Sequence, residues 1–160
     1  MKSAYIRSRL DEIEGAISKA ESVAGRELDP EIQSFFARYI VVAASGVYED
    51  CIERLFSDFA RLFGDPKVTT FFSNVLDAHF RNPKYDELKK WLNYLDPSFG
   101  TQLDSSLGGS LRSNEALNSI VANKNQVAHG SPCTATLGDV KNYHKRIVPI
   151  FDAMENMLGL

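Results

Sequence analysis

The sequence has few features of a secreted, membrane or nucleic-acid-coating protein. Its two cysteines, Cys51 and Cys133, lie far apart and outside any CxxC or Cys/His pattern. One accidental disulfide or two reduced thiols fit this spacing, and we expect reduced thiols. No stretch approaches the ~20 apolar residues of a membrane span, and residues 1–10 include basic residues but no apolar run. We therefore expect a cytoplasmic protein without a membrane partner.

The chain also lacks an excess of basic residues. Its formal net charge is -3, which argues against a protein that coats DNA through many phosphate contacts. That charge does not exclude an enzyme that meets RNA at one local site. The sequence contains no glycine-rich phosphate loop, no HExxH and no other metal-ligand spacing, so we expect neither a cofactor nor a bound metal.

What remains is an ordinary globular composition, with 44% apolar and 24% charged residues. A length of 160 residues is typical of one domain, and neither a repeat nor a linker interrupts it. We therefore expect a single domain over residues 1–160.

Apolar residues recur at helical spacing through most of the chain, which predicts an all-α helical bundle. Sequence breaks delimit the helices: Asp29-Pro30 favours a helix start, Gly64-Asp65-Pro66 and Gly130-Ser131-Pro132 favour stops, and Thr136 with Asp139 resembles a capping box. Pro149 should kink the last helix. The expected helices are 4–24, 30–63, 67–80, 84–95, 112–129 and 137–158, with weak helical signals between 96 and 111. We expect the aromatic side chains along these helices to be core rather than base-stacking residues: Phe56, Phe59, Phe63, Phe71 and Phe72.

One short stretch carries a recognisable pattern. Residues 118–130 read NSIVANKNQVAHG. This stretch resembles the signature of the HEPN superfamily, in which an Arg, usually followed by Asn, precedes a His by several residues. Lys124 and Asn125 occupy the Arg-Asn positions, and His129 and Gly130 close the motif. A helix before the motif and a capped helix after it agree with the resemblance.

The subgroup that the chain most resembles is the RiboL-PSP-HEPN type, in which an acidic residue on an early long helix accompanies the motif. Glu49 is the candidate for that residue, with Asp50 as the fallback. The resemblance implies a HEPN-type bundle with long early helices, shorter middle helices and a C-terminal helical hairpin. Catalytic HEPN proteins are metal-independent endoribonucleases, and many are toxins or phage-defence components. The implied partners are RNA, a second copy of the chain and, in a toxin system, an antitoxin protein.

RNA cleavage by transesterification needs a base for the 2′-hydroxyl, an acid for the leaving oxygen and a cation for the phosphorane charge. His129 suits the first two roles near neutral pH. Asn125, four residues earlier, shares its helix face and can orient the imidazole or hold a phosphate oxygen. Lys124 lies about 140° away around the helix, and its long side chain can bring a cation to the phosphate.

One histidine cannot act as acid and base at once. The dipole at the end of its helix and the negative charge of Glu49 both favour the imidazolium, so an acid role for His129 is at least as plausible as a base role. Two copies of the site that meet across a dimer would supply both groups.

Plainer interpretations stay open. His129 can be a surface or helix-capping residue, Glu49 an ion-pair partner of a nearby Arg or Lys, and Lys124 a solvated charge. Because Lys124 replaces the family Arg, a second hypothesis is a non-catalytic module that binds RNA, nucleotide or a protein partner. A third is a structural bundle with a chance motif. His79 and His144 have no partner at useful spacing and are predicted to be structural or surface residues.

Overall fold

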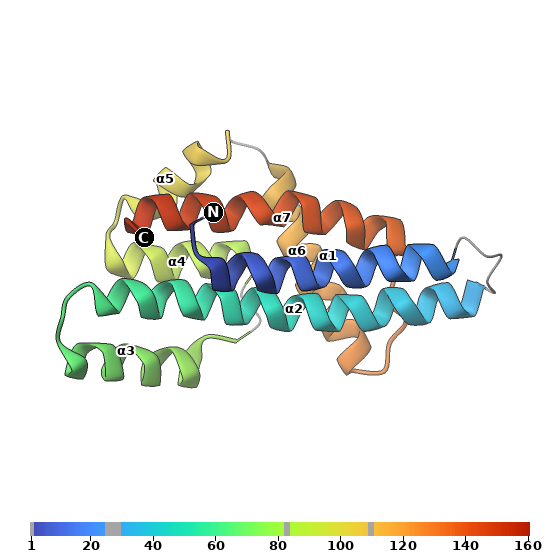
Figure 1. Cartoon of the computed structure of the whole chain (residues 1–160), viewed down its shortest axis with the longest axis horizontal. Coiled ribbons are helices and arrows are strands. Elements are labelled where there is room, and N and C mark those ends of the chain that lie inside the picture. The colour runs from blue at the N-terminus through green and yellow to red at the C-terminus, as the bar shows by residue number, and fades with distance from the viewer. Residues whose placement is uncertain (1, 25–29, 82–83, 109–110) are drawn as a thin grey trace.

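The all-α prediction is confirmed by the computed structural model of the chain, which describes residues 2–24, 30–81, 84–108 and 111–160 (Figure 1). Within these ranges the chain forms seven helices and no strand. None of those helices has both the length and the apolar character needed to cross a bilayer. The helices are α1 (Ala4–Ala24), α2 (Pro30–Arg61), α3 (Pro66–His79), α4 (Tyr85–Leu95), α5 (Phe99–Ser106), α6 (Leu111–Ala128) and α7 (Leu137–Leu158).

Six of these helices agree with the predicted ranges to within two residues at each end. α5 was not predicted as a helix, since glycines and a proline dilute its signal. The structure explains one of those glycines: the Gly100 N–H donates to Oδ1 of Asn93 at 2.8 Å, and a Cβ at Gly100 would lie 2.7 Å from that atom. Glycine thus permits the close approach of α5 to α4. The sequence also favours helix ends at Gly25 and at Asn82-Pro83; these positions and the predicted helix start at Asp29 lie outside the described residues.

The three longest helices, α1, α2 and α7, lie side by side and contact one another in pairs (Figure 1). α3 returns along the second half of α2, and α4 packs on α5. α6 contacts both α2 and α7 and crosses them steeply in Figure 1. Because α6 crosses α2, the C-terminal end of α6, where the sequence motif lies, extends beyond α2.

One helix face shows how the sequence pattern builds the core. The buried residues of α1 recur every three or four positions, so one stripe of the helix faces α2 and α7. α2 and α7 contribute buried rings to the same core, and the ring centroids of Tyr48 and Phe151 lie 6.0 Å apart. The α1 stripe comprises Ile6, Leu10, Ile13, Ile17 and Ala20.

Not every apolar residue predicted to face the core does so. On the first half of α2, Phe35 and Tyr39 are 61% and 62% exposed, and Ile32 and Val42 are also exposed. The prediction that the phenylalanine series lies in the core is correct for Phe56, Phe59 and Phe72, which are buried or half-buried, and wrong for Phe63 and Phe71, which are exposed. Apolar spacing identifies a face, but only the packing shows whether anything covers it.

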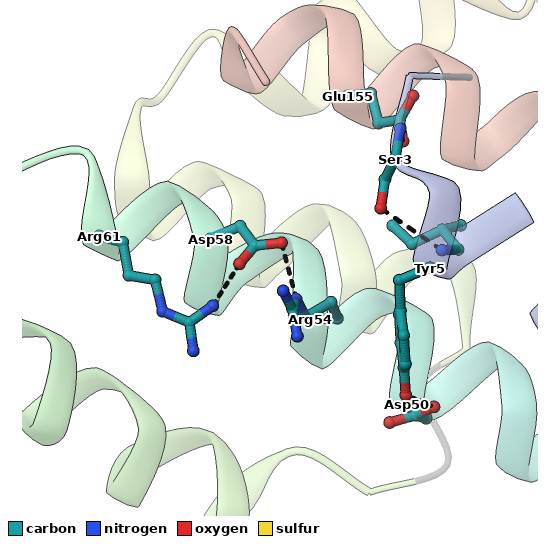
Figure 2. A network of polar contacts seen from close by, with 8 residues as sticks. Ser3, Tyr5, Asp50, Arg54, Asp58, Arg61 and Glu155 are labelled. Carbon is teal, nitrogen blue, oxygen red and sulfur yellow. Dashed lines mark hydrogen bonds and ion pairs between the residues drawn. The ribbon is translucent and has the colours of Figure 1, made fainter.

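Polar contacts fasten the start of α1 to its neighbours (Figure 2). The buried carboxylate of Glu155 on α7 accepts hydrogen bonds from the N–H groups of Lys2 and Ser3, at 2.6 and 3.0 Å. Those donors precede the first helical turn, so Glu155 places a negative charge at the positive end of the α1 dipole. The hydroxyl of Tyr5 donates to Asp50 on α2 at 2.8 Å. The start of α1 is therefore held by α7 through Glu155 and by α2 through Asp50.

Side chains cap the starts of α3 and α7. Asp65 accepts a hydrogen bond from the Lys67 N–H, and Pro66 opens α3. Thr136 and Asp139 form the predicted capping box, and the Thr136 hydrogen bonds lower the pKa of Asp139. α7 continues through Pro149. The bend expected there stays a prediction.

Candidate active site

The motif occupies the last turn of α6 and the reversal that follows it. Gly130 has φ of +72°, a left-handed conformation that side chains rarely adopt. The N–H of Gly130 donates to the Val127 carbonyl at 3.1 Å, and the N–H of Ser131 donates to the Gln126 carbonyl at 2.8 Å. These two bonds form a Schellman motif, with Gly130 just beyond the cap residue His129. The backbone thus presents His129 at the tip of the helix.

The motif residues differ in exposure. His129 is exposed, whereas Asn125 and Lys124 are half-buried. The His129 N–H donates to the Asn125 carbonyl at 3.1 Å, so the two residues lie one turn apart on the same side, as predicted. Lys124 follows the buried residues Ile120 and Val121 by four and three positions, which puts it on the side of α6 that faces α2. An exposed imidazole and a half-buried amide therefore share one side, and Lys124 starts about 100° from Asn125 around the helix.

A residue that sequence reasoning missed holds this arrangement together. Asn123 is buried, and its Oδ1 accepts hydrogen bonds from the N–H groups of Thr134 and Ala135, both at 3.0 Å. The same atom accepts from the Thr134 hydroxyl at 3.1 Å and the Cys133 thiol at 3.3 Å. The loop that leaves His129 is thereby tied back to α6. Its position next to Lys124-Asn125 was the only available signal, because its partners lie 10 to 12 residues away in a loop.

The predicted acidic residue faces α6, but not at the level of His129. Glu49 lines a small gap with Leu117, Ile120 and Val121. Val121 precedes His129 by eight residues, about 12 Å along a helix that rises 1.5 Å per residue. Glu49 therefore lies nearer the turn of α6 that holds Lys124 than the turn that holds the imidazole.

Glu49 also takes part in an ion pair, as its plainer interpretation predicted. Its Oε1 lies 3.7 Å from Nη1 of Arg81, and Oε1 of Glu53 lies 4.0 Å from the same nitrogen. Burial and the neighbouring Glu49 raise the pKa of Glu53. The fallback, Asp50, points elsewhere: it accepts a hydrogen bond from the hydroxyl of Tyr5 on α1 (Figure 2) and another from Nε of Arg9 on the same helix. Of the two acidic candidates, only Glu49 faces the motif helix.

The other reactive residues lie apart from the motif or serve the fold. Cys51 is buried in the core, and burial raises the pKa of its thiol to about 12. Cys133 is half-buried, and both cysteines are free. His79 is exposed at the end of α3, and His144 is buried with Nδ1 2.8 Å from the Tyr48 hydroxyl. In the described part of the chain, His, Cys, Asp and Glu side chains form no group of three or more that could hold a metal ion.

The comparison with protein families decides the membership of the chain. The model of the RiboL-PSP-HEPN family matches residues 4–159. The chain belongs to the RiboL-PSP-HEPN family. Among curated proteins and solved structures, no match was found. The match covers the seven helices formed by the described residues of this RiboL-PSP-HEPN protein, so the resemblance extends beyond the motif to the rest of the chain.

Proposed function

We propose that this RiboL-PSP-HEPN protein is a metal-independent endoribonuclease that cleaves RNA by attack of the ribose 2′-hydroxyl. His129 is the general acid or base, Asn125 orients its imidazole or a phosphate oxygen, and Lys124 balances phosphate charge. Glu49 is a positioning residue on the Lys124 side. The observation that carries the proposal is the exposed imidazole at the tip of α6, one turn beyond Asn125 and fixed by a capped, anchored reversal. A toxin or phage-defence role, with an antitoxin partner, would fit this activity.

The proposed enzyme is a homodimer, because each chain offers one motif histidine for two proton transfers. The exposed apolar residues on the first half of α2 are spaced by three, four and three positions, so they form one stripe (the α2 stripe: Ile32, Phe35, Tyr39 and Val42). Val42 lies about one turn before Ser45, which lines a small gap together with residues of α6. A second copy paired through the α2 stripe would cover apolar surface and bring two α6 tips toward one groove.

The proposal is tested with purified protein and RNA. His129→Ala should abolish cleavage and leave the circular dichroism spectrum unchanged, while His79→Ala, which alters an exposed histidine on α3, should cleave like the wild type. Cleavage should persist in EDTA and leave 2′,3′-cyclic phosphate ends. Equal cleavage by His129→Ala, or products that end in a 3′-hydroxyl, would refute the assignment.

One observation favours a second function. Lys124 stands where the family has Arg, and a single ammonium cannot hold a phosphate with two parallel hydrogen bonds as a guanidinium does. A non-catalytic module that binds RNA, nucleotide or a protein partner is therefore the alternative. In that case neither the wild type nor Lys124→Arg would cleave RNA.

A further inference from the structure

A cavity of about 540 Å³ opens far from the motif, between the end of α5, the start of α6 and the middle of α7. Arg112 on α6 and Lys145 and Arg146 on α7 line it. Arg112 precedes His129 by 17 residues, about 25 Å along α6. This cavity is therefore separate from the candidate active site, and its function does not rest on RNA cleavage.

The cavity lining carries a net positive charge, whereas the chain as a whole is negatively charged. Three cationic side chains and one carboxylate, Asp152, line it, whereas the whole chain has a net charge of -3. Neither Lys145 nor Arg146 forms an ion pair with a carboxylate of the described residues, and both are exposed. Lys145 and Arg146 are neighbours on α7, so an anion in the cavity would be attracted by two adjacent positive charges.

One wall of the cavity is a single face of α7 that combines cationic, acidic and neutral groups. Lys145, Pro149, Asp152 and Asn156 follow one another by four, three and four positions, so one face of α7 forms this wall. Pro149 has no N–H, so the helix supplies no donor four residues after Lys145, and the Lys145 carbonyl is left as an acceptor. A ligand with a phosphate at one end and hydroxyl or amino groups at the other matches this lining. The volume lies within the usual range for small-molecule sites.

We propose that this cavity binds the phosphate group of a nucleotide-sized ligand, with Arg112, Lys145 and Arg146 around the phosphate. Guanidinium groups supply forked hydrogen bonds to phosphate oxygens, and the ammonium adds a point charge. Asp152 and Asn156 face the uncharged part of the ligand. The phosphate can come from a free nucleotide or from a nucleic-acid strand, and binding experiments separate the two sources.

The test uses isothermal titration calorimetry on the full chain, with ATP, ADP, AMP and uncharged adenosine as probes, and a short 2′-O-methyl oligonucleotide that cannot be cleaved at the ribose. The cavity variant is Lys145→Ala/Arg146→Ala, and its charge-matched control is Lys67→Ala/Lys84→Ala, two exposed lysines that do not line the cavity. Thermal melting checks that both variants stay folded.

We expect saturable binding of the phosphorylated probes, at least tenfold weaker binding by the cavity variant, unchanged binding by the control, and no binding of adenosine. Oligonucleotide binding that depends on Lys145 and Arg146, with no binding of free nucleotides, would assign the phosphate to a nucleic-acid strand. Affinity that is equal in the wild type and the cavity variant for every probe, or no binding by the wild type at millimolar concentration, would overturn the proposal.

Discussion

Replacement of Asn123 by alanine tests whether one side chain holds the connection between α6 and α7. Oδ1 of Asn123 accepts from the N–H and hydroxyl of Thr134 and from the N–H of Ala135. Asn123 and Ala135 are 6% and 7% exposed, so water has little access to either. Alanine would remove the acceptor and leave these donors to find other partners.

The expected loss follows from the burial of each donor. The N–H of Ala135 is buried, and leaving it without an acceptor costs about 1–3 kcal/mol. The two donors of Thr134 are on an exposed residue and can turn to water, so each loses about 0.5–1.5 kcal/mol at most. We expect Asn123→Ala to lower the free energy of unfolding by about 2–4 kcal/mol. For a chain of this length that is a fall in Tm of about 4–16 °C.

Urea and thermal unfolding, followed by circular dichroism, measure this change. The matched control is Asn142→Ala, since Asn142 is an exposed residue of α7 and its replacement should change stability by no more than about 0.5 kcal/mol. If the loop positions His129, RNA cleavage well below Tm should also fall in Asn123→Ala. A stability loss no larger than that of the control would refute the view that Asn123 anchors the loop.

Three further predictions concern charge, association and pH. In an active enzyme Lys124→Arg should keep or raise the rate of RNA cleavage. Lys124→Ala and Lys124→Gln should each lose about 2–4 kcal/mol of transition-state stabilisation. Equal cleavage rates for all three variants would show that Lys124 does not act in catalysis. Phe35→Glu/Tyr39→Glu should give a monomer by light scattering and lose cleavage, while Phe71→Glu, at an exposed aromatic on α3, should stay dimeric; a persistent dimer in the double variant would exclude the α2 stripe. Burial lowers the pKa of His144, so its contribution to stability is complete above its ordinary pKa of about 6.5 and is lost as the pH falls toward the folded value. His144→Gln should flatten the fall in stability below that pH, and an unchanged slope in urea unfolding would contradict this.

The sequence predicted helices well because helix formation depends on neighbours within a few residues. The ranges of α1 and α7 were predicted to the residue, and the capping box at Thr136 and Asp139 was found from spacing alone. α5 was missed because Gly100 weakens its local signal, although contact with Asn93 on α4 makes that glycine necessary. Information about such contacts is absent from a short window of sequence.

The candidate site could be predicted only in part, because some of its residues contact partners that lie far away in the sequence. The motif from Lys124 to His129 was found in consecutive residues of the sequence, and the roles of those residues stay predictions. The anchoring role of Asn123 depends on a loop that folds back, and His144 was assigned no partner although Tyr48, 96 residues earlier, bonds to it. Glu49 was chosen by resemblance, and its place opposite Val121 became visible only in the packed bundle.

The His129-Gly130 pair carries two kinds of information, one about the backbone and one about the chemistry. The left-handed conformation of Gly130 allows the two to be told apart. Gly130 is required by the backbone of the reversal, with φ of +72°, whether or not the protein cleaves RNA. In a saturation screen, substitutions at Gly130 should reduce the amount of folded protein, whereas substitutions at His129 should leave that amount intact and remove only cleavage. Under the proposed function, a chain that keeps the glycine and has lost the histidine would fold with the same α6–α7 connection and would not cleave RNA, so the glycine alone does not predict activity.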